Sequence, residues 1–231
     1  MKRFYRKAEP VQRAGGHGII LDGKPIKTPG KRDLILPNRA LASAIAEEWN
    51  AQQTEVRTAT MPLTRFAVTS TDRVAAQRDA IIRQTSNDAA TDLVCYRATH
   101  PPALAARQQE VWQPLIDWAA LRYDAPLVVT SGVIPKSQPA ASLRAFTSAV
   151  AEQEDFALTA LNIATAACGS LIIALALLEG QLDAREAFAA SQLDESFQIE
   201  GWGEDPEQAE RRRALEADIE AAAQFLSLLR A

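Results

Sequence analysis

The pattern of apolar residues changes near Met61-Pro62, and this change constrains the fold more than any other feature. Before it, short alternating stretches are broken by Gly15-Gly16 and Asp22-Gly23, which is typical of β-strands joined by turns. After it, apolar residues recur at helical spacing to the end of the chain. Alanine, a strong helix former, makes up roughly a fifth of the residues. The chain therefore combines a β-rich part with a longer helical part.

The β-rich part contains one clear hairpin signal. The stretches Gly18–Leu21 and Pro25–Thr28 flank Asp22-Gly23, a pair that suits the positive φ angles of a type I′ turn. Residues 34–36 predict a further short strand that ends before Pro37. Asn38 then predicts the N-cap of a helix that runs to about Gln53.

The remaining elements follow from caps and helical periodicity. Asp72 predicts the cap of a helix to about Ala90, Asp183 and Glu186 have capping-box spacing, and Asp205 with Pro206 predicts the start of the last helix. The stretch 161–178 carries no charge, and its polar residues favour a buried helix over a membrane span. The expected helices cover about residues 72–90, 104–123, 140–152, 156–179, 183–200 and 206–229, with a connector over 124–139.

These elements predict an α+β fold with a small N-terminal β-rich domain and a larger all-helical domain. The boundary is expected between residues 58 and 59, giving domains 1–58 and 59–231. Charge changes along the chain as well, since residues 1–70 carry 12 Lys and Arg against 6 Asp and Glu, while the remainder carries 13 against 23. The net charge of −4 does not favour nucleic-acid binding.

No catalytic or metal-binding motif is convincing. Gly18, Gly23 and Lys24 have the spacing of a phosphate-binding loop, but Pro25 stands where a magnesium-binding hydroxyl is needed, so the hairpin interpretation is favoured. Cys95 with His100 lacks a third orienting group, and a structural thiol is favoured over a nucleophile. Two distant histidines do not make a metal site, so neither a cofactor nor a metal is expected.

A stripe of polar residues is the strongest candidate site. Asp194, Glu195, Gln198 and Trp202 recur along one face if a helix persists to residue 202. Such a stripe is either a solvated acidic face or a surface for a partner, and Trp202 between two glycines favours the partner. Charge reversal at Asp194 or Glu195 is expected to leave the fold intact.

Three other tryptophans, Trp49, Trp112 and Trp118, are interpreted as core residues. Trp49 follows Leu41 and Ile45 at helical spacing, so it is expected to be at least partly buried. Substitution of Trp49 by Arg is therefore expected to act through folding.

A series of short phrases resembles the ATP synthase assembly chaperones that bind the α subunit of the catalytic head, the Atp-twelve family. The resemblance spans nearly the whole chain, and the ordered series is more specific than any one phrase. The phrases are Arg3-Phe4-Tyr5, Leu21-Asp22-Gly23-Lys24-Pro25-Ile26-Lys27-Thr28-Pro29, Ala46-Glu47-Glu48-Trp49-Asn50-Ala51-Gln52, Met61-Pro62-Leu63-Thr64-Arg65, Asp92-Leu93-Val94-Cys95-Tyr96-Arg97, Gly169-Ser170-Leu171, Leu193-Asp194-Glu195-Ser196-Phe197-Gln198 and Trp202-Gly203-Glu204-Asp205.

The resemblance implies a chaperone without enzyme activity that holds the unassembled α subunit until the β subunit displaces it. It also implies functional importance for the acidic residue of the Leu-Asp-Glu phrase and for Trp49. Many relatives have Glu where this chain has Asp194, so Asp194 or the adjacent Glu195 is the counterpart. A bacterial cytoplasmic protein is expected, because the resemblance begins at residue 3; eukaryotic relatives act in the mitochondrial matrix.

Two alternatives from other classes remain. One is a small hydrolase or transferase that uses Cys95 or the Asp194 and Glu195 pair. The other is a general holdase that binds many unfolded proteins.

Overall fold

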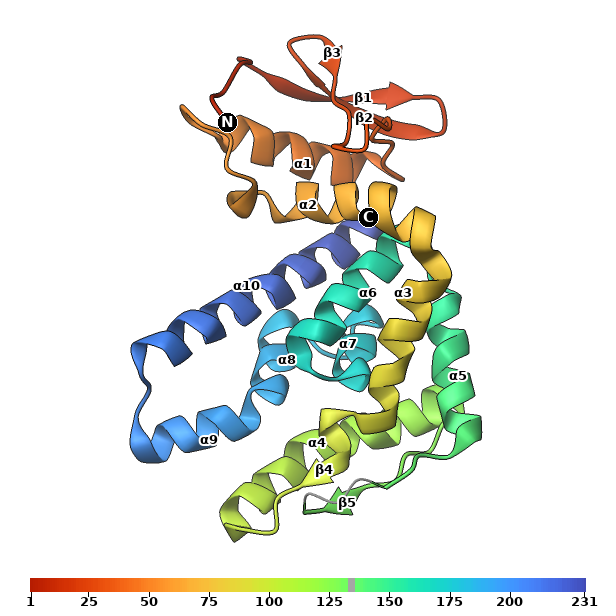
Figure 1. Cartoon of the computed structure of the whole chain (residues 1–231), viewed down its shortest axis with the longest axis vertical. Coiled ribbons are helices and arrows are strands. Elements are labelled where there is room, and N and C mark those ends of the chain that lie inside the picture. The colour runs from red at the N-terminus through yellow and green to blue at the C-terminus, as the bar shows by residue number, and fades with distance from the viewer. Residues whose placement is uncertain (133–135) are drawn as a thin grey trace. The chain divides into compact units, whose positions relative to one another are not determined.

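The Asp22-Gly23 pair forms the predicted hairpin in the computed structural model, which describes residues 1–132 and 136–231. The strands β2 (Gly16–Leu21) and β3 (Lys24–Pro25) are antiparallel, and the φ angles of Asp22 and Gly23 are 47° and 83°. The strand β1 (Ala8–Arg13) pairs with β2, so the sheet has the order β1-β2-β3 (Figure 1).

Residues 34–36 do not form the predicted strand. Leu34 and Leu36 are buried, but only Leu36 pairs with the sheet, through two backbone hydrogen bonds with His17 of 2.7 and 2.9 Å. Gly16 permits this close approach, because a Cβ atom there would lie 2.3 Å from the carbonyl oxygen of Leu36. Pro37 follows and has no N–H group to continue a ladder.

The helix α1 (Arg39–Ala51) begins as predicted. The side chain of Asn38 accepts a hydrogen bond of 2.9 Å from the amide of Leu41, and Leu41 and Ile45 are buried where α1 packs on β1 and β2. The helix ends at Ala51, before the predicted end at Gln53. A sheet covered by one amphipathic helix thus forms the N-terminal part of the fold.

The helix predicted to start at Asp72 starts ten residues earlier. The helix α2 (Pro62–Thr69) continues through a π-helical turn (Ser70–Val74) into α3 (Ala75–Asn87). Asp72 lies inside that turn, and its carboxylate accepts hydrogen bonds from the Thr28 hydroxyl (2.7 Å) and the Gly30 amide (2.8 Å). Asp72 is therefore not the cap of this helix. The groups that donate hydrogen bonds to its carboxylate lie in a distant loop, which spacing along the sequence does not reveal.

The described residues form two compact units, and three helices have residues in both. The first unit is Met1–Arg78, Glu154–Ala160 and Gln224–Ala231, and the second is Asp79–Gln153 and Leu161–Ala223. The α+β class predicted from the sequence is confirmed, with a small antiparallel sheet followed by a helical part. The division at residues 58 and 59 stays a prediction.

From residue 96 onward the described part of the chain is mainly helical. Two short strands in it, β4 (Tyr96–Arg97) and β5 (Thr130–Ser131), are parallel. Residues 133–135 of the predicted connector lie outside the described residues. The helices are α4 (Pro102–Tyr123), α5 (Ala140–Ala151), α6 (Asp155–Cys168), α7 (Leu171–Leu178), α8 (Ala184–Ser191), α9 (Leu193–Trp202) and α10 (Pro206–Leu229).

Two stretches predicted as single helices are each divided in two. The stretch 156–179 breaks at Gly169, whose φ is 62°, and Ser170 then caps α7. The stretch 183–200 breaks at Gln192, between α8 and α9. Residues 171–177 of α7 are all buried, in agreement with the buried-helix prediction. Among the described residues, no helix has both the length and the hydropathy needed to cross a membrane.

The caps of the later helices are confirmed. Asp183 and Glu186 form the capping box of α8, and the Asp205 carboxylate accepts a hydrogen bond of 2.9 Å from the amide of Gln208. These caps involve residues only three positions apart, which explains why sequence spacing identified them.

Candidate functional site

The four residues of the predicted stripe lie on one helix, because α9 persists to Trp202. They differ greatly in exposure. Asp194 and Glu195 are half-buried, Gln198 is exposed, and Trp202 is 87% exposed. The stripe therefore runs from a packed first turn to an open last turn.

A hydrogen bond from the buried side-chain amide of Gln108 links Asp194 to α4. Its Oδ1 accepts a hydrogen bond of 2.7 Å from Nε2 of Gln108, and Oε1 of Gln108 accepts one of 2.7 Å from the amide of Ala98. Burial raises the pKa of Asp194, while the Gln108 hydrogen bond and the charge of Arg97 oppose that rise. Asp194 is thus a structural contact of α9 as well as a candidate partner contact.

The guanidinium of Arg97 lies in the same cluster. It stacks over the ring of Trp112 at 5.2 Å from the ring centroid, and Nη1 donates to the carbonyl of Val94. Its Nε and Nη2 atoms are buried and have no hydrogen-bond acceptor among the described residues. Burial lowers the pKa of Arg97, an effect opposed by the negative charge of Asp194. Neither Arg97 nor Gln108 was singled out from the sequence, although Arg97 ends one of the quoted phrases.

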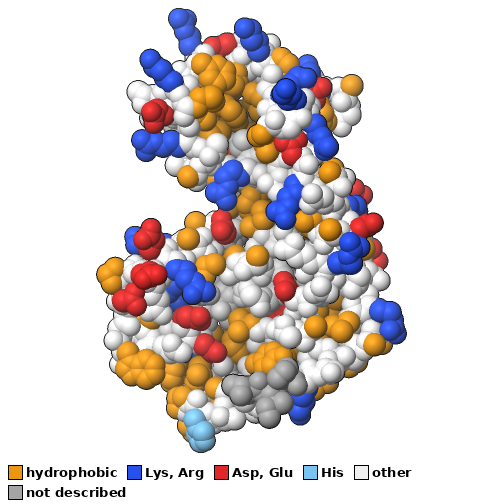
Figure 2. All heavy atoms as spheres, viewed as in Figure 1, with side chains coloured by type: hydrophobic (Ala, Val, Ile, Leu, Met, Phe, Trp, Pro, Cys, Tyr) orange, Lys and Arg blue, Asp and Glu red, His pale blue; other side chains and the backbone are white. Residues whose placement is uncertain are grey.

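Two hollows lie along α9, the first at its packed first turns and the second toward its open end. The first has a volume of about 430 Å³ between α4, α8 and α9, and its apolar lining residues are Val111, Leu115, Leu182, Ala189, Ala190 and Leu193. The second has a volume of about 540 Å³ between α8, α9 and α10, where acidic and basic side chains gather (Figure 2). Trp202 lines neither hollow, but it lies on the helix that borders both, and a large exposed aromatic residue is characteristic of an interaction surface.

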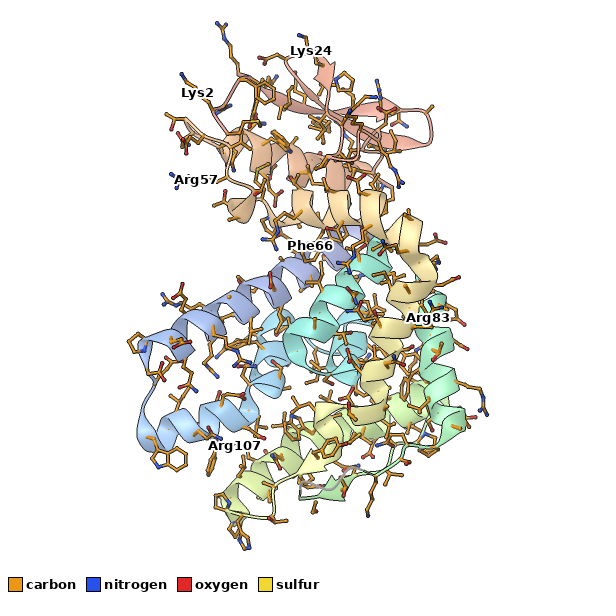
Figure 3. All side chains as sticks on the ribbon, viewed as in Figure 1. Lys2, Lys24, Arg57, Phe66, Arg83 and Arg107 are labelled. Carbon is orange, nitrogen blue, oxygen red and sulfur yellow. The ribbon has the colours of Figure 1, made fainter. Side chains whose placement is uncertain are left out.

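A bidentate ion pair holds this end of α9 to α4. Arg107, labelled in Figure 3, donates to both carboxylate oxygens of Glu200 at 2.7 and 3.0 Å and lies over the ring of Phe197 at 5.3 Å. The backbone that carries Trp202 is therefore supported although the indole itself is exposed.

Trp49 lies in the first unit and is half-buried. Its ring contacts Tyr5 in a T-shaped arrangement with centroids 5.6 Å apart, and the Tyr5 hydroxyl donates a hydrogen bond of 2.6 Å to the Trp49 carbonyl. The indole Nε1 is buried without an acceptor among the described residues. Of the other two tryptophans, Trp112 is fully buried and Trp118 is half-buried.

The groups considered for catalysis are poorly placed for it. Cys95 is buried, and burial raises the pKa of its thiol to about 12, which disfavours the nucleophilic thiolate. His100 is exposed. The phosphate-loop residues form the β2–β3 hairpin. In the described parts of the chain, no three His, Cys, Asp or Glu side chains gather as metal ligands would.

Comparison with known proteins identifies relatives of this chain. Residues 2–120 match the family model described as ATP12 chaperone protein. A structure of Atp12 from Paracoccus denitrificans is 42% identical with a TM-score of 0.95, and it covers 99% of this chain and 98% of its own. A point mutant of that protein has the same identity and TM-score.

More distant relatives agree with this match. The Atu1473 protein of Agrobacterium tumefaciens is 40% identical with a TM-score of 0.91, covering 99% of this chain and 85% of its own. The mitochondrial protein atp12 of Schizosaccharomyces pombe is 23% identical over 87% of this chain and 74% of its own length. The chain thus belongs to the ATP12 chaperone family, a family of ATP synthase assembly chaperones.

Proposed function

We propose that this chain binds the unassembled α subunit of the ATP synthase catalytic head. It shields the surface of α that later faces the β subunit, and β displaces it during assembly. Family membership supports the assembly role, and the exposed indole of Trp202, on the helix that borders two hollows, is the observation that carries the binding site. We extend the proposal to a cytoplasmic location, since solved relatives come from bacteria.

The proposed contact surface is the outer face of α9, made by Glu195, Gln198 and Trp202, with Asp194 at its packed end. An α subunit without its neighbours exposes apolar interface that tends to aggregate. Trp202 supplies a large apolar contact, and Glu195 and Asp194 supply negative charge for cationic groups of the client. A surface of this mixed character binds with moderate strength, so the true partner is able to replace it.

The direct test is an aggregation and displacement assay. Purified α subunit should stay in solution when this protein is present and should elute with it as a complex that lacks β. Added β subunit should release the chaperone. If α aggregates equally with and without this protein, the proposal is wrong.

A matched pair of variants locates the contact. Trp202→Ala should weaken α binding by about tenfold or more, as truncation of an aromatic contact residue typically does. Leu121→Ala removes a side chain that is equally exposed, at 88%, but lies on α4 away from α9, and it should bind α like the parent. Equal binding by all three proteins would exclude the outer face of α9 as the contact.

The two alternative functions make different predictions. A general holdase would protect unrelated aggregating proteins as well as α, so an unrelated client such as denatured citrate synthase belongs in the same assay. A hydrolase or transferase that uses Cys95 would react with a thiol reagent in the folded state. We expect protection of α alone and no modification of folded protein, because Cys95 is buried.

A further inference from the structure

The first unit carries an open apolar groove that the proposed function does not use. It has a volume of about 570 Å³ and lies between the N-terminal residues, the β2–β3 hairpin and the end of α1. Its volume is in the range of binding sites for small ligands and peptide side chains. Its lining residues are Met1, Phe4, Tyr5, Leu21, Asp22, Lys24, Pro25, Ile26, Lys27 and Trp49.

Aromatic rings form one wall of this groove. The rings of Phe4 and Tyr5 are 5.4 Å apart, and Tyr5 in turn contacts Trp49. Phe4 is 64% exposed and Met1 is 71% exposed, so this wall is open to solvent. Figure 2 shows hydrophobic side chains on this part of the surface with Lys and Arg side chains on several sides. Large exposed apolar residues gathered in one place mark interaction sites.

The charged side chains that line the groove are Lys24, Lys27 and Asp22, so cations outnumber carboxylates there. Residues 1–27 contain seven Lys and Arg against two Asp and Glu. Lys24, labelled in Figure 3, is exposed and has no carboxylate partner among the described residues, whereas Lys27 lies 3.5 Å from Asp33. The field at the groove therefore attracts negative charge.

Asp22, the carboxylate among the lining residues, already accepts hydrogen bonds from the backbone. Asp22 accepts hydrogen bonds of 2.9 Å each from the amides of Arg6 and Lys7, and these bonds lower its pKa. Asp22 therefore stays ionised and offsets one positive charge, but the seven Lys and Arg of residues 1–27 still outnumber the two Asp and Glu.

We propose that this groove binds an acidic polypeptide segment that inserts one bulky apolar side chain between Phe4 and Ile26. The aromatic wall would contact the apolar side chain, and Lys24, which has no carboxylate partner among the described residues, would pair with a flanking carboxylate. Charge complementarity selects this occupant, since a basic segment would meet like charges on the rim. The proposal concerns a surface separate from α9 and does not depend on the identity of the client.

The test uses the full chain and a set of synthetic peptides of about twelve residues, read by fluorescence anisotropy. One peptide has Leu and Phe at its centre between Asp and Glu residues. Three others replace the acids by Lys, replace the acids by Ser, or replace Leu and Phe by Ser. We expect the acidic apolar peptide to bind at least about tenfold more tightly than each of the others, and about 300 mM NaCl to weaken it.

Two matched pairs of variants locate the peptide. Lys24→Glu should reduce binding about tenfold, while Lys31→Glu makes the same charge change on an exposed residue outside the groove and should have a smaller effect. Phe4→Ser should likewise reduce binding, and Leu121→Ser, at an exposed apolar residue of the other unit, should not. All four positions are exposed, so the variants should keep the parent melting temperature.

Several outcomes would overturn the proposal. These are equal affinity for the acidic and basic peptides, an equal loss of affinity in Lys24→Glu and Lys31→Glu, or no measurable binding of the acidic apolar peptide. None of them bears on whether Trp202 contacts the α subunit, so failure here is distinguishable from failure of the proposed function.

Discussion

At the scale of single residues, Trp49 has a ring that packs well and an indole N–H that donates no hydrogen bond to the described residues. The ring packs on Tyr5, but the buried Nε1–H has no acceptor among the described residues, and an unsatisfied buried donor costs about 1–3 kcal/mol. Trp49→Phe keeps an aromatic ring and removes the donor, so its free energy of unfolding should lie within about 1 kcal/mol of the parent. Trp49→Ala should lose about 2–4 kcal/mol, since the side chain is only half-buried.

Thermal and urea melts of the two variants beside the parent make this measurement. Trp49→Arg should lose at least as much free energy of unfolding as Trp49→Ala, because it adds a charge to an apolar contact. A Phe variant as unstable as the Ala variant would show that the indole nitrogen itself is needed. Parent-like melting of Trp49→Ala together with lost α binding would make Trp49 a client contact.

The two adjacent carboxylates of α9 should respond differently to charge reversal, although the sequence alone suggested that both are dispensable for folding. Asp194→Lys loses the hydrogen bond from Gln108 and places a cation near Arg97, so it should lower stability by about 1–3 kcal/mol. Glu195→Lys breaks no such contact and should cost less than about 1 kcal/mol.

Urea denaturation of both variants tests this difference, with Asp194→Asn as the control. The Asn carbonyl still accepts from Gln108, so that variant should remain close to the parent in stability. If Asp194→Lys and Glu195→Lys proved equally stable, the Gln108 contact would contribute little to folding. Any loss of α binding by Glu195→Lys would then reflect the client surface directly.

At the scale of elements, the start of α7 depends on a buried carboxylate. Asp92 is fully buried and accepts hydrogen bonds from the Ser170 hydroxyl (2.6 Å) and the Ile172 amide (3.1 Å). Burial raises the pKa of Asp92 to about 6, above its ordinary value of 3.8. The folded state therefore holds this proton more tightly than the unfolded state, so this group favours folding below about pH 4.

That contribution should be lost as the pH rises from about 4 to about 6, and it should be absent above pH 6. In urea melts over this range, Asp92→Asn should show a flatter pH dependence than the parent, because Asn does not titrate. It should also be less stable at neutral pH by about 1–3 kcal/mol, since its NH₂ group faces donors. An identical pH profile for parent and variant would contradict the raised pKa.

At the scale of the whole molecule, the predicted boundary between residues 58 and 59 separates groups that are in contact. The carboxylate of Glu48 accepts hydrogen bonds from the amides of Leu63 (2.7 Å) and Thr64 (2.8 Å), and Phe66 contacts Phe225 with ring centroids 5.3 Å apart. A fragment of residues 1–58 lacks all of these partners. We expect it to show no cooperative thermal transition by circular dichroism, whereas the full chain should show one.

A cooperative transition in the fragment would instead support residues 1–58 as an independent domain. Glu48→Gln in the full chain is a useful companion, because it weakens the same contact without removing residues. It should lower the melting temperature by a few degrees, as the loss of a charged hydrogen-bond acceptor does.

Local structure was predictable from the sequence wherever the deciding contacts lie a few residues apart. The Asp22-Gly23 turn, the Asn38 cap and the Asp183 capping box are of this kind. Backbone dihedral preferences and short-range hydrogen bonds act within a few residues, so spacing alone reveals them. The sequence phrases likewise identified the family, which the comparisons confirmed.

The tertiary structure alone decided which distant side chains meet. Asp194 and Gln108 are 86 residues apart, Asp72 accepts from Thr28 across 44 residues, and the break at Gln192 follows no Gly or Pro. Such contacts arise when packed faces bring polar groups together, and a buried polar group then takes whichever partner lies within reach. The sequence by itself determined the elements whose caps and turns are local, and it indicated the chaperone family; packing determined that Asp194 is anchored while Trp202 stays exposed.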